Sequence, residues 1–239
     1  MANVRKLYLI PSELALGMGS ETLPKHTICG IKSLRYFFVE NVKTTRRFIS
    51  SLKLDKKIED LFFFEITESI TDKDMADFIS TIPSGENIGL LSDCGNPCIA
   101  DPGAKVVSYA HRHDIQVIPL VGPSSILLTL IASGFNGQNF AFHGYVPIEK
   151  VALVEFLKKI ENESQRENKT QLFMDTPYRN NRLLETILTV CRSQTKLCIA
   201  ANLTAENEYV RSLSIHEWKK NLPSLHKQPV MYALYAATL

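Results

Sequence analysis

Short apolar runs alternate with amphipathic segments along most of the chain. The runs at residues 7–10, 37–39 and 62–64 are too short for buried helices and predict strands. Further strands are expected at residues 88–91, 117–121, 140–142, 170–174, 196–200, 208–214 and 229–235. Residues 208–214 alternate between apolar and polar positions, as an exposed antiparallel strand does. This pattern predicts an α/β protein.

Helices are expected between several of these strands. Thr71 or Asp72 is placed to cap a helix whose apolar residues repeat on one face up to Ile82. Other helices are predicted at residues 104–113, 125–132, 151–160 and 181–192, and the polar residues 161–169 are predicted to form a loop. The helix at 104–113 completes a βαβ unit with the strands on either side of it. We therefore expect those two strands to be parallel neighbours.

The length of 239 residues allows one large domain or two smaller ones. Strands and helices alternate in both halves, and antiparallel signals are concentrated in the second half. We expect a boundary near residue 120, which gives an N-terminal α/β domain of residues 1–120 and a C-terminal α/β domain of residues 121–239. No flexible linker marks this boundary.

The composition is that of an ordinary globular protein, with 45% apolar and 22% charged residues. No apolar stretch approaches the roughly 20 residues that a membrane span needs, and the first residues do not form a secretory signal. The five cysteines are an odd number, which argues against a disulfide framework. Cys94 and Cys98 lack partners for a zinc site, so no metal is expected, and most cysteines are predicted to be buried apolar residues.

Positive charge is concentrated in the first quarter of the chain. Residues 1–57 contain eleven Lys and Arg against four Asp and Glu, a net charge of +7. Residues 58–239 contain sixteen against twenty-one, a net charge of −5. The basic segment is either a solvated helix surface or a surface that binds phosphate groups, and both interpretations stay open.

Two strand-to-helix loops carry the strongest chemical signal. The loop at residues 92–103 reads SDCGNPCIADPG, and the loop at 119–125 reads PLVGPSS. Glycines allow close backbone approach, and prolines fix φ and remove N–H donors, so the first loop suits a polar, partly cationic small molecule better than a polyphosphate. Asp93 and Asp101 are expected to hold this loop through their own side chains. Neither dinucleotide nor P-loop fingerprints occur.

We expect the two loops to end neighbouring strands at the carboxyl edge of one sheet, where open α/β sheets bind ligands. The sequence at 92–103, followed by VIPLVGPSS at 117–125 and FHGYVP at 142–147, resembles the S-adenosylmethionine-dependent tetrapyrrole methylase superfamily. It is most similar to the small-subunit ribosomal RNA (cytidine-2′-O)-methyltransferases, whose loop reads S-D-A-G-T-P-x-I-x-D-P-G. The likeness extends from residue 7 to residue 234.

This resemblance implies two α/β domains, each a mixed sheet flanked by helices, with S-adenosylmethionine in a cleft between them. It also implies a homodimer that acts in rRNA processing, on ribosomal RNA or the small ribosomal subunit. The lack of an apolar span and of a secretory signal predicts a cytoplasmic protein without a membrane. Position by position, the resemblance assigns cofactor contacts to Pro11, Cys94, Gly95, Asn96, Ile99, Ala100, Ser124, Ser125, Asp175, Leu203, Pro229 and Val230.

The chain departs from the family pattern at several charged positions. Residues 40–43 read E-N-V-K where the family has E-D-T-R, so the glutamate is kept. Residues 201–204 read A-N-L-T in place of R-E-L-T, and 227–229 read K-Q-P in place of a motif beginning K-G-E. Residues 11–16 lack the glycine of the family's first loop, whereas 175–179 keep its pattern as D-T-P-Y-R. Cofactor-side loops are retained, and the substrate side has changed.

Methyl transfer to a ribose hydroxyl needs alignment and a general base. Glu40 is the retained carboxylate, and it is either that base or an ordinary charge at the end of a strand. Lys43, Arg46 and Arg179 are the predicted partners of substrate phosphates or carboxylates. The leading hypothesis is 2′-O-methylation of ribose in small-subunit rRNA. The alternatives are methylation of a tetrapyrrole or another small acceptor, and a cofactor- or RNA-binding module with little turnover.

Overall fold

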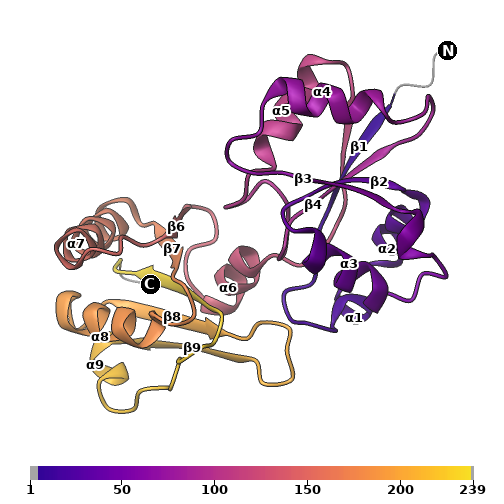
Figure 1. Cartoon of the computed structure of the whole chain (residues 1–239). Coiled ribbons are helices and arrows are strands. Elements are labelled where there is room, and N and C mark those ends of the chain that lie inside the picture. The colour runs from indigo at the N-terminus through magenta and orange to yellow at the C-terminus, as the bar shows by residue number, and fades with distance from the viewer. Residues whose placement is uncertain (1–4, 238–239) are drawn as a thin grey trace. The chain divides into compact units, whose positions relative to one another are not determined.

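The computed structural model describes residues 5–237, and the chain divides into two units at Ser124 and Ser125. The sequence pattern predicts this division near residue 120. Each unit contains its own five-stranded sheet and its own hydrophobic core (Figure 1). Within residues 5–237, no helix combines the length and the apolar character that a membrane span requires.

The sheet of unit 1 is entirely parallel, with the strand order β3-β2-β4-β1-β5. Its strands are β1 (Lys6–Ile10), β2 (Tyr36–Val39), β3 (Phe62–Glu65), β4 (Ile88–Leu91) and β5 (Gln116–Pro119). All five were predicted within one or two residues of these bounds. A parallel sheet has helices on both faces, so its central strands are apolar throughout, and β4 is buried at every position.

Two helical layers cover the two faces of this sheet (Figure 1). One layer contains α1 (Gly19–Thr22), α2 (Lys25–Ser33) and α3 (Val42–Ser51), and the other contains α4 (Asp72–Ser80) and α5 (Ala104–Arg112); the short 3-10 helix η1 (Ile58–Asp60) precedes β3. Successive side chains of β2 point to opposite faces of the sheet, so this strand contributes to the hydrophobic core on each face. Phe37 packs beneath the first layer and Phe38 beneath the second, and both are fully buried.

The predicted adjacency of β4 and β5 is wrong. The two strands are parallel, as the βαβ unit predicts, but β1 lies between them and pairs with both. The register places Ile10 beside Leu91, and Leu9 beside Pro119. The segment that begins at Pro11 therefore leaves the sheet between the two loops that carry the sequence motifs.

The sheet of unit 2 is mixed, with the strand order β6-β7-β10-β8-β9. Its strands are β6 (Phe140–Tyr145), β7 (Thr170–Met174), β8 (Lys196–Ala201), β9 (Tyr209–Ser214) and β10 (Val230–Tyr235). Only the β6–β7 pair is parallel, and the other pairs are antiparallel. The antiparallel character expected for this half of the chain is confirmed.

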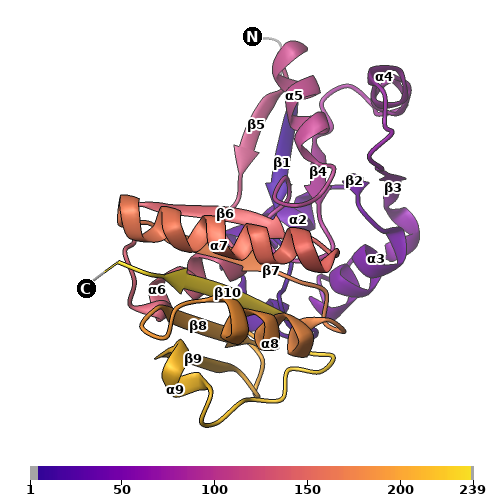
Figure 2. The same ribbon diagram turned by 90° about the vertical axis from the view of Figure 1, so that its left-hand side faces the viewer.

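Helices cover the two faces of this sheet unequally. The helices are α6 (Ser125–Ser133), α7 (Lys150–Glu167), α8 (Asn180–Val190) and α9 (Ile215–Trp218). Figure 2 shows α7 and α8 in front of the sheet, over a large core that includes the fully buried Phe173, Tyr232 and Trp218. On the other face, α6 packs over a smaller cluster of Leu130, Leu172, Cys198 and Ala233.

The loop predicted at residues 161–169 is wrong for most of its length, because α7 continues to Glu167. Two of its polar residues, Glu161 and Ser164, face inward and are bound there. Glu161 is 4% exposed, forms an ion pair with Arg192 and accepts a hydrogen bond from the backbone N–H of the same residue at 2.8 Å. The buried Ser164 accepts a hydrogen bond from the backbone N–H of Ala236 at 2.8 Å. Polarity at these positions reflects tertiary partners and does not mark a helix end.

The cysteines divide between core and surface. Cys191 and Cys198 are buried and Cys98 is half-buried. Cys29 and Cys94 are exposed, so these two do not have the buried apolar role predicted for most of the cysteines. All five thiols are free.

Candidate functional site

The segments that follow β1, β4 and β5 are hydrogen-bonded to one another at the carboxyl edge of the unit 1 sheet. The backbone N–H of Ser12, after β1, donates to the carbonyl of Gly95 at 2.8 Å. The side-chain amide of Asn96 donates to the carbonyl of Pro123, after β5, at 3.1 Å. We call residues 11–14, 92–103 and 120–124 the three-loop junction. The position of β1 between β4 and β5 is what brings the three segments together.

The backbones of this junction approach one another closely. A Cβ atom at Gly122 would lie 2.2 Å from Cγ of Pro11, so no other residue fits there without movement of one segment. Gly95 has a φ of +72°, in the left-handed region that favours glycine. The glycines of the two loops are therefore required by geometry, as the sequence predicts.

The loop at 92–103 is closed by the side chain of Asp101. Its Oδ1 accepts the backbone N–H of Cys98 at 2.9 Å and that of Gly103 at 2.7 Å. The predicted structural role of Asp101 is thereby confirmed. Cys98 and Ala100 have φ values of +72° and +60°, and left-handed backbone at such residues costs about 1–3 kcal/mol each. The loop holds strained backbone in place with a carboxylate clamp.

The predicted cofactor contacts of unit 1 lie on this junction. Pro11 and Gly95 are buried, Asn96 and Ser124 are half-buried, and three residues are exposed: Cys94, Ile99 and Ala100. The surface of the loop thus combines an exposed backbone turn with an apolar side chain, since Ile99 is 46% exposed. Partial burial raises the pKa of the Cys94 thiol, with further increases from Asp93, Glu40 and Glu13. This sulfur is therefore a neutral thiol near pH 7 and a poor nucleophile.

Four carboxylates stand at the carboxyl ends of four adjacent strands of unit 1. They are Glu65 at the end of β3, Glu40 after β2, Asp93 after β4 and Glu13 after β1. Among residues 5–237, none of the four forms an ion pair. We call this set the acidic edge. Of the four, only Glu40 is predicted from the sequence to take part in the chemistry, although an acid closely follows or ends each of these strands.

Three carboxylates of the acidic edge each accept a backbone N–H. Glu13 is bound to Gly19 at 2.7 Å, Glu40 to Asp93 at 3.0 Å, and Glu65 to Val42 at 3.1 Å. In each case the bond is made by Oε2. Glu40 therefore joins the end of β2 to the start of the loop at 92–103, so it is more than an isolated charge at the end of a strand.

Asp93 differs from the other three carboxylates. Its Oδ1 is buried and has no hydrogen-bond partner among residues 5–237, so the expected Asx-type bond within its own loop is not formed. Burial, with the negative charges of Glu40 and Glu65, raises the pKa of Asp93 to about 6. The structural role predicted for this residue is wrong, and a perturbed carboxyl group lies within the junction.

Four predicted site residues of unit 2 lie at one end of its sheet: Asp175, Leu203, Pro229 and Val230. The backbone N–H of Asn202, next to Leu203, donates to the carbonyl of Pro229 at 3.0 Å. Val230 pairs with Ala201 at the start of β10. On the other side of β10, the loop after β7 is joined to the residues before β10 by a bond from the N–H of Lys227 to the carbonyl of Pro177, at 3.1 Å. Ser125 is the first residue of α6.

The basic residues predicted to bind substrate are placed differently from one another. Arg179 forms an ion pair with Asp175, whose side chain is 5% exposed, and Nε of Arg179 donates to Oγ1 of Thr176 at 3.2 Å. Much of its guanidinium is therefore already engaged. Lys43 and Arg46 are exposed on α3, and the guanidinium of Arg46 lies 6.0 Å from the ring centroid of Phe63. The role of these three residues in substrate binding stays a prediction.

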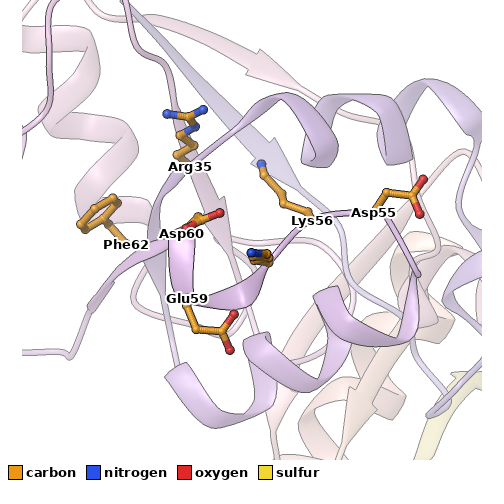
Figure 3. Close-up of a pocket in the computed structure, with 7 residues that line it drawn as sticks. Arg35, Asp55, Lys56, Glu59, Asp60 and Phe62 are labelled. Carbon is orange, nitrogen blue, oxygen red and sulfur yellow. The ribbon is translucent and has the colours of Figure 1, made fainter.

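A separate pocket lies at the opposite, amino edge of the unit 1 sheet. Figure 3 shows Arg35 and Phe62, at the starts of β2 and β3, together with Lys56 and acidic neighbours. It is lined by Arg35, Asp55, Lys56, Lys57, Glu59, Asp60 and Phe62. Acidic and basic side chains are equal in number in this lining, and none of the predicted site residues belongs to it.

No protein-family model matches the chain. Among curated proteins, it is 25% identical over 211 residues to the ribosomal RNA small subunit methyltransferase I of Vibrio cholerae, across 88% of this chain and 69% of the relative. The protein of the same name from Buchnera aphidicola subsp. Schizaphis graminum is 24% identical, across 93% and 75%. That from Pseudomonas aeruginosa is 31% identical, across 59% and 50%. The alignments thus span between half and three quarters of these relatives.

Solved structures with a similar fold cover nearly the whole chain. The methyltransferase CobJ matches with a TM-score of 0.61 and 12% identity, across 97% of this chain and 94% of that one. The uroporphyrin-III-C-methyltransferase of Thermus thermophilus matches with a TM-score of 0.56 and 17% identity, across the same shares. Diphthine synthase gives 0.67 and 14%, across 98% and 90%. At such identities these structures show the fold.

The chain shares its fold with solved methyltransferases, among them CobJ and uroporphyrin-III-C-methyltransferase, and it is similar in sequence to proteins named ribosomal RNA small subunit methyltransferase I. These findings support the resemblance to the tetrapyrrole methylase superfamily, a class of methyltransferases. The resemblance inferred from the two loops and the predicted α/β architecture are confirmed. Within this class the chain is a methyltransferase homologous to proteins named ribosomal RNA small subunit methyltransferase I.

Proposed function

We propose that the protein uses S-adenosylmethionine to methylate the 2′-hydroxyl of a ribose in small-subunit ribosomal RNA. The observation that carries this proposal is the three-loop junction, in which the two motif loops and the start of the Pro11 segment are bonded at one sheet edge. Its position agrees with the general rule that open α/β sheets bind ligands at the carboxyl ends of their strands. The relatives' names supply the nucleic-acid substrate.

The residues of unit 1 fit a sulfonium donor in two respects. Within the described residues 5–237, the carboxylates of the acidic edge form no ion pair with a cation, and such a surface attracts a positively charged ligand. The exposed Ile99 and the bare backbone of Gly95 give apolar and main-chain contacts beside it. Phosphate groups would be disfavoured at such an edge, which agrees with the absence of a P-loop fingerprint.

When bound, S-adenosylmethionine supplies an electrophilic methyl group on a positively charged sulfur. The chain's own residues then have three tasks. The junction backbone fixes the donor in one orientation, because its strained turn is already clamped by Asp101. A carboxylate of the acidic edge accepts the hydroxyl proton of the acceptor. Lys43 and Arg46, exposed on α3, are proposed to bind RNA phosphates.

The unit 2 residues proposed to contact the cofactor are Ser125, Asp175, Leu203, Pro229 and Val230. Arg179 is proposed to reach substrate only through the part of its guanidinium that Asp175 leaves accessible, since 24% of its side chain is exposed. The proposal also includes a homodimer in the cytoplasm, where ribosomal subunits are found. Light scattering of the purified chain measures its molar mass and so tests the homodimer directly.

The decisive experiment uses methyl-labelled S-adenosylmethionine and small ribosomal subunits that lack the modification. Label that survives alkaline hydrolysis within a dinucleotide identifies 2′-O-methylation, because alkaline cleavage needs a free 2′-hydroxyl. Label that is released with mononucleotides would indicate base methylation and would overturn the ribose assignment. Absence of label in RNA would overturn the RNA substrate.

Two alternatives are tested with the same protein. The structural similarity to CobJ and to uroporphyrin-III-C-methyltransferase makes a tetrapyrrole the natural small acceptor to compare, and transfer to it in place of RNA would favour that class. Calorimetric binding of S-adenosylmethionine without transfer to either acceptor would favour a binding module with little turnover. The changed charges at residues 40–43 and 201–204 are the reason to include this last case.

A further inference from the structure

Asp93 combines three features that no other carboxylate of the acidic edge shares. It lies two positions beyond β4, inside the loop that carries the strongest motif. Its backbone N–H donates to Glu40 at 3.0 Å, which fixes its main chain between two strand ends. Its Oδ1 is buried and finds no hydrogen-bond partner in the part of the chain that the structure describes. A buried carboxylate oxygen without a partner favours the protonated form, which is the state that a general base must reach.

We propose that Asp93 is the general base of the methyl transfer and that Glu40 is its positioning residue. This inference rests on the proposed function and deepens it, because it assigns the proton transfer to one carboxyl group. Glu40 was the sequence-derived candidate for the base. In the structure its Oε2 already accepts the N–H of Asp93, and Glu40 therefore acts on the reaction through Asp93.

The chemical step balances without a further reactant. The acceptor hydroxyl loses its proton to a carboxylate oxygen of Asp93, and the oxygen lone pair forms the new O–C bond. The C–S bond breaks with its electron pair on sulfur, so the sulfonium becomes a neutral thioether. Asp93 ends neutral and returns its proton to water before the next cycle. The transfer thereby removes the positive charge of the sulfonium and the negative charge of Asp93, so the net negative charge of the acidic edge is smaller until Asp93 releases its proton.

The surrounding charges explain why Asp93 is matched to this task. Glu40 after β2 and Glu65 at the end of β3 both raise its pKa, and burial contributes the largest increase. No cation forms an ion pair with Asp93 among residues 5–237. A pKa of about 6 leaves the carboxylate mostly ionised at pH 7, yet makes it a stronger base than an ordinary aspartate.

The test measures single-turnover methyl transfer against pH with wild type, Asp93→Asn, Glu40→Gln and the control Asp77→Asn. Asp77 is exposed on α4. We expect Asp93→Asn to lower the rate by about 10²–10⁴-fold while S-adenosylmethionine affinity, measured by calorimetry, stays within about 3-fold. We expect the wild-type rate to rise with pH through about 6. Asp77→Asn should match the wild type.

Glu40→Gln separates positioning from catalysis. Glutamine keeps an oxygen that can accept the N–H of Asp93 but removes a negative charge, so the pKa of Asp93 should fall. The expected result is a pH midpoint shifted to lower pH with a loss of rate much smaller than that of Asp93→Asn. This shift requires electrostatic contact with the base, and a merely structural residue would not produce it.

Three outcomes would overturn the assignment. One is a methyl-transfer rate for Asp93→Asn near that of the wild type. Another is a pH midpoint of the rate that is unchanged in Glu40→Gln. A third is a larger loss of rate in Glu40→Gln than in Asp93→Asn, which would make Glu40 the base. If Asp93→Asn fails to fold in a thermal melt, the Glu40→Gln profile still decides. A wild-type chain that binds cofactor but transfers no methyl group to RNA would instead refute the proposed function, and this inference with it.

Discussion

The ring of Pro11 lies directly against the backbone of Gly122, so that a Cβ atom on Gly122 would be 2.2 Å from Cγ and 2.4 Å from Cβ of the proline. These residues belong to segments that follow β1 and β5, and the contact brings the Pro11 segment next to the loop at 120–124. The absence of one methyl group therefore decides how closely two strand ends approach. The following prediction depends on this contact.

Gly122→Ala should disturb the junction without unfolding unit 1. Because the new methyl group meets a rigid ring, we expect a destabilisation of about 1–3 kcal/mol and at least a 10-fold loss of S-adenosylmethionine affinity. Thermal melts and calorimetry measure the two effects. The matched control is Gly137→Ala, since a Cβ at Gly137 meets no atom within 4 Å. Unchanged affinity in Gly122→Ala would show that the junction does not hold the cofactor.

Asp101→Ala should open the loop at 92–103. The substitution removes the acceptor for the backbone N–H groups of Cys98 and Gly103, and an unpaired donor costs about 1–3 kcal/mol. Asp101 accepts no proton from substrate in our scheme, so the variant should lose cofactor affinity and leave the pH midpoint of methyl transfer unchanged. A variant with shifted pH dependence and normal affinity would contradict this role. Asp77→Ala on α4 controls for the loss of one surface charge.

The sequence predicts single elements well because each strand and helix has its own periodic pattern. Residues 88–91 are a continuous apolar run and residues 170–174 end in one, and both are strands with the predicted bounds. Strand order is different, because it depends on contacts between distant segments. The insertion of β1 between β4 and β5 leaves no trace in the local pattern of either strand. The polar residues of α7 were misread for a similar reason, since Glu161 is satisfied by the distant Arg192.

The candidate site shows the same division. The two motif loops were found from their glycines and prolines, and Asp101 was given its role from local turn chemistry. Asp93 was given a similar role, but its environment is created by Glu40 and Glu65 from other strands. A sequence shows that an acid follows a strand and does not show which acids become neighbours across a sheet. The cluster of acids could have been recognised from the sequence only if the order of the strands in the sheet had been known.

Arg179→Ala should destabilise unit 2 even when no substrate is present. The arginine is the ion-pair partner of Asp175, whose side chain is 5% exposed, and its removal leaves a buried carboxylate without a cation. We expect a loss of about 1–3 kcal/mol in the free energy of unfolding, measured in urea. Arg182→Ala is the control, because Arg182 is exposed on the same helix. Equal stability of the two variants would show that the ion pair contributes nothing.

The perturbed carboxyl group of Asp93 should also be visible in the stability of the protein without any substrate. Its pKa in the folded state is about 6, above the value of an unfolded aspartate, so the unfolded state loses its proton first. The contribution of Asp93 to stability therefore becomes less favourable as the pH rises from about 4 to about 6 and is constant at higher pH.

Asp93→Asn cannot ionise and lacks this dependence. The difference in melting temperature, variant minus wild type, should consequently increase across that window in calorimetric scans and then level off. The control Asp77→Asn should give a difference that does not change over the same range. A flat difference for Asp93→Asn would mean that this carboxyl group titrates like an exposed one, and the case for a matched base would then fail on stability data alone.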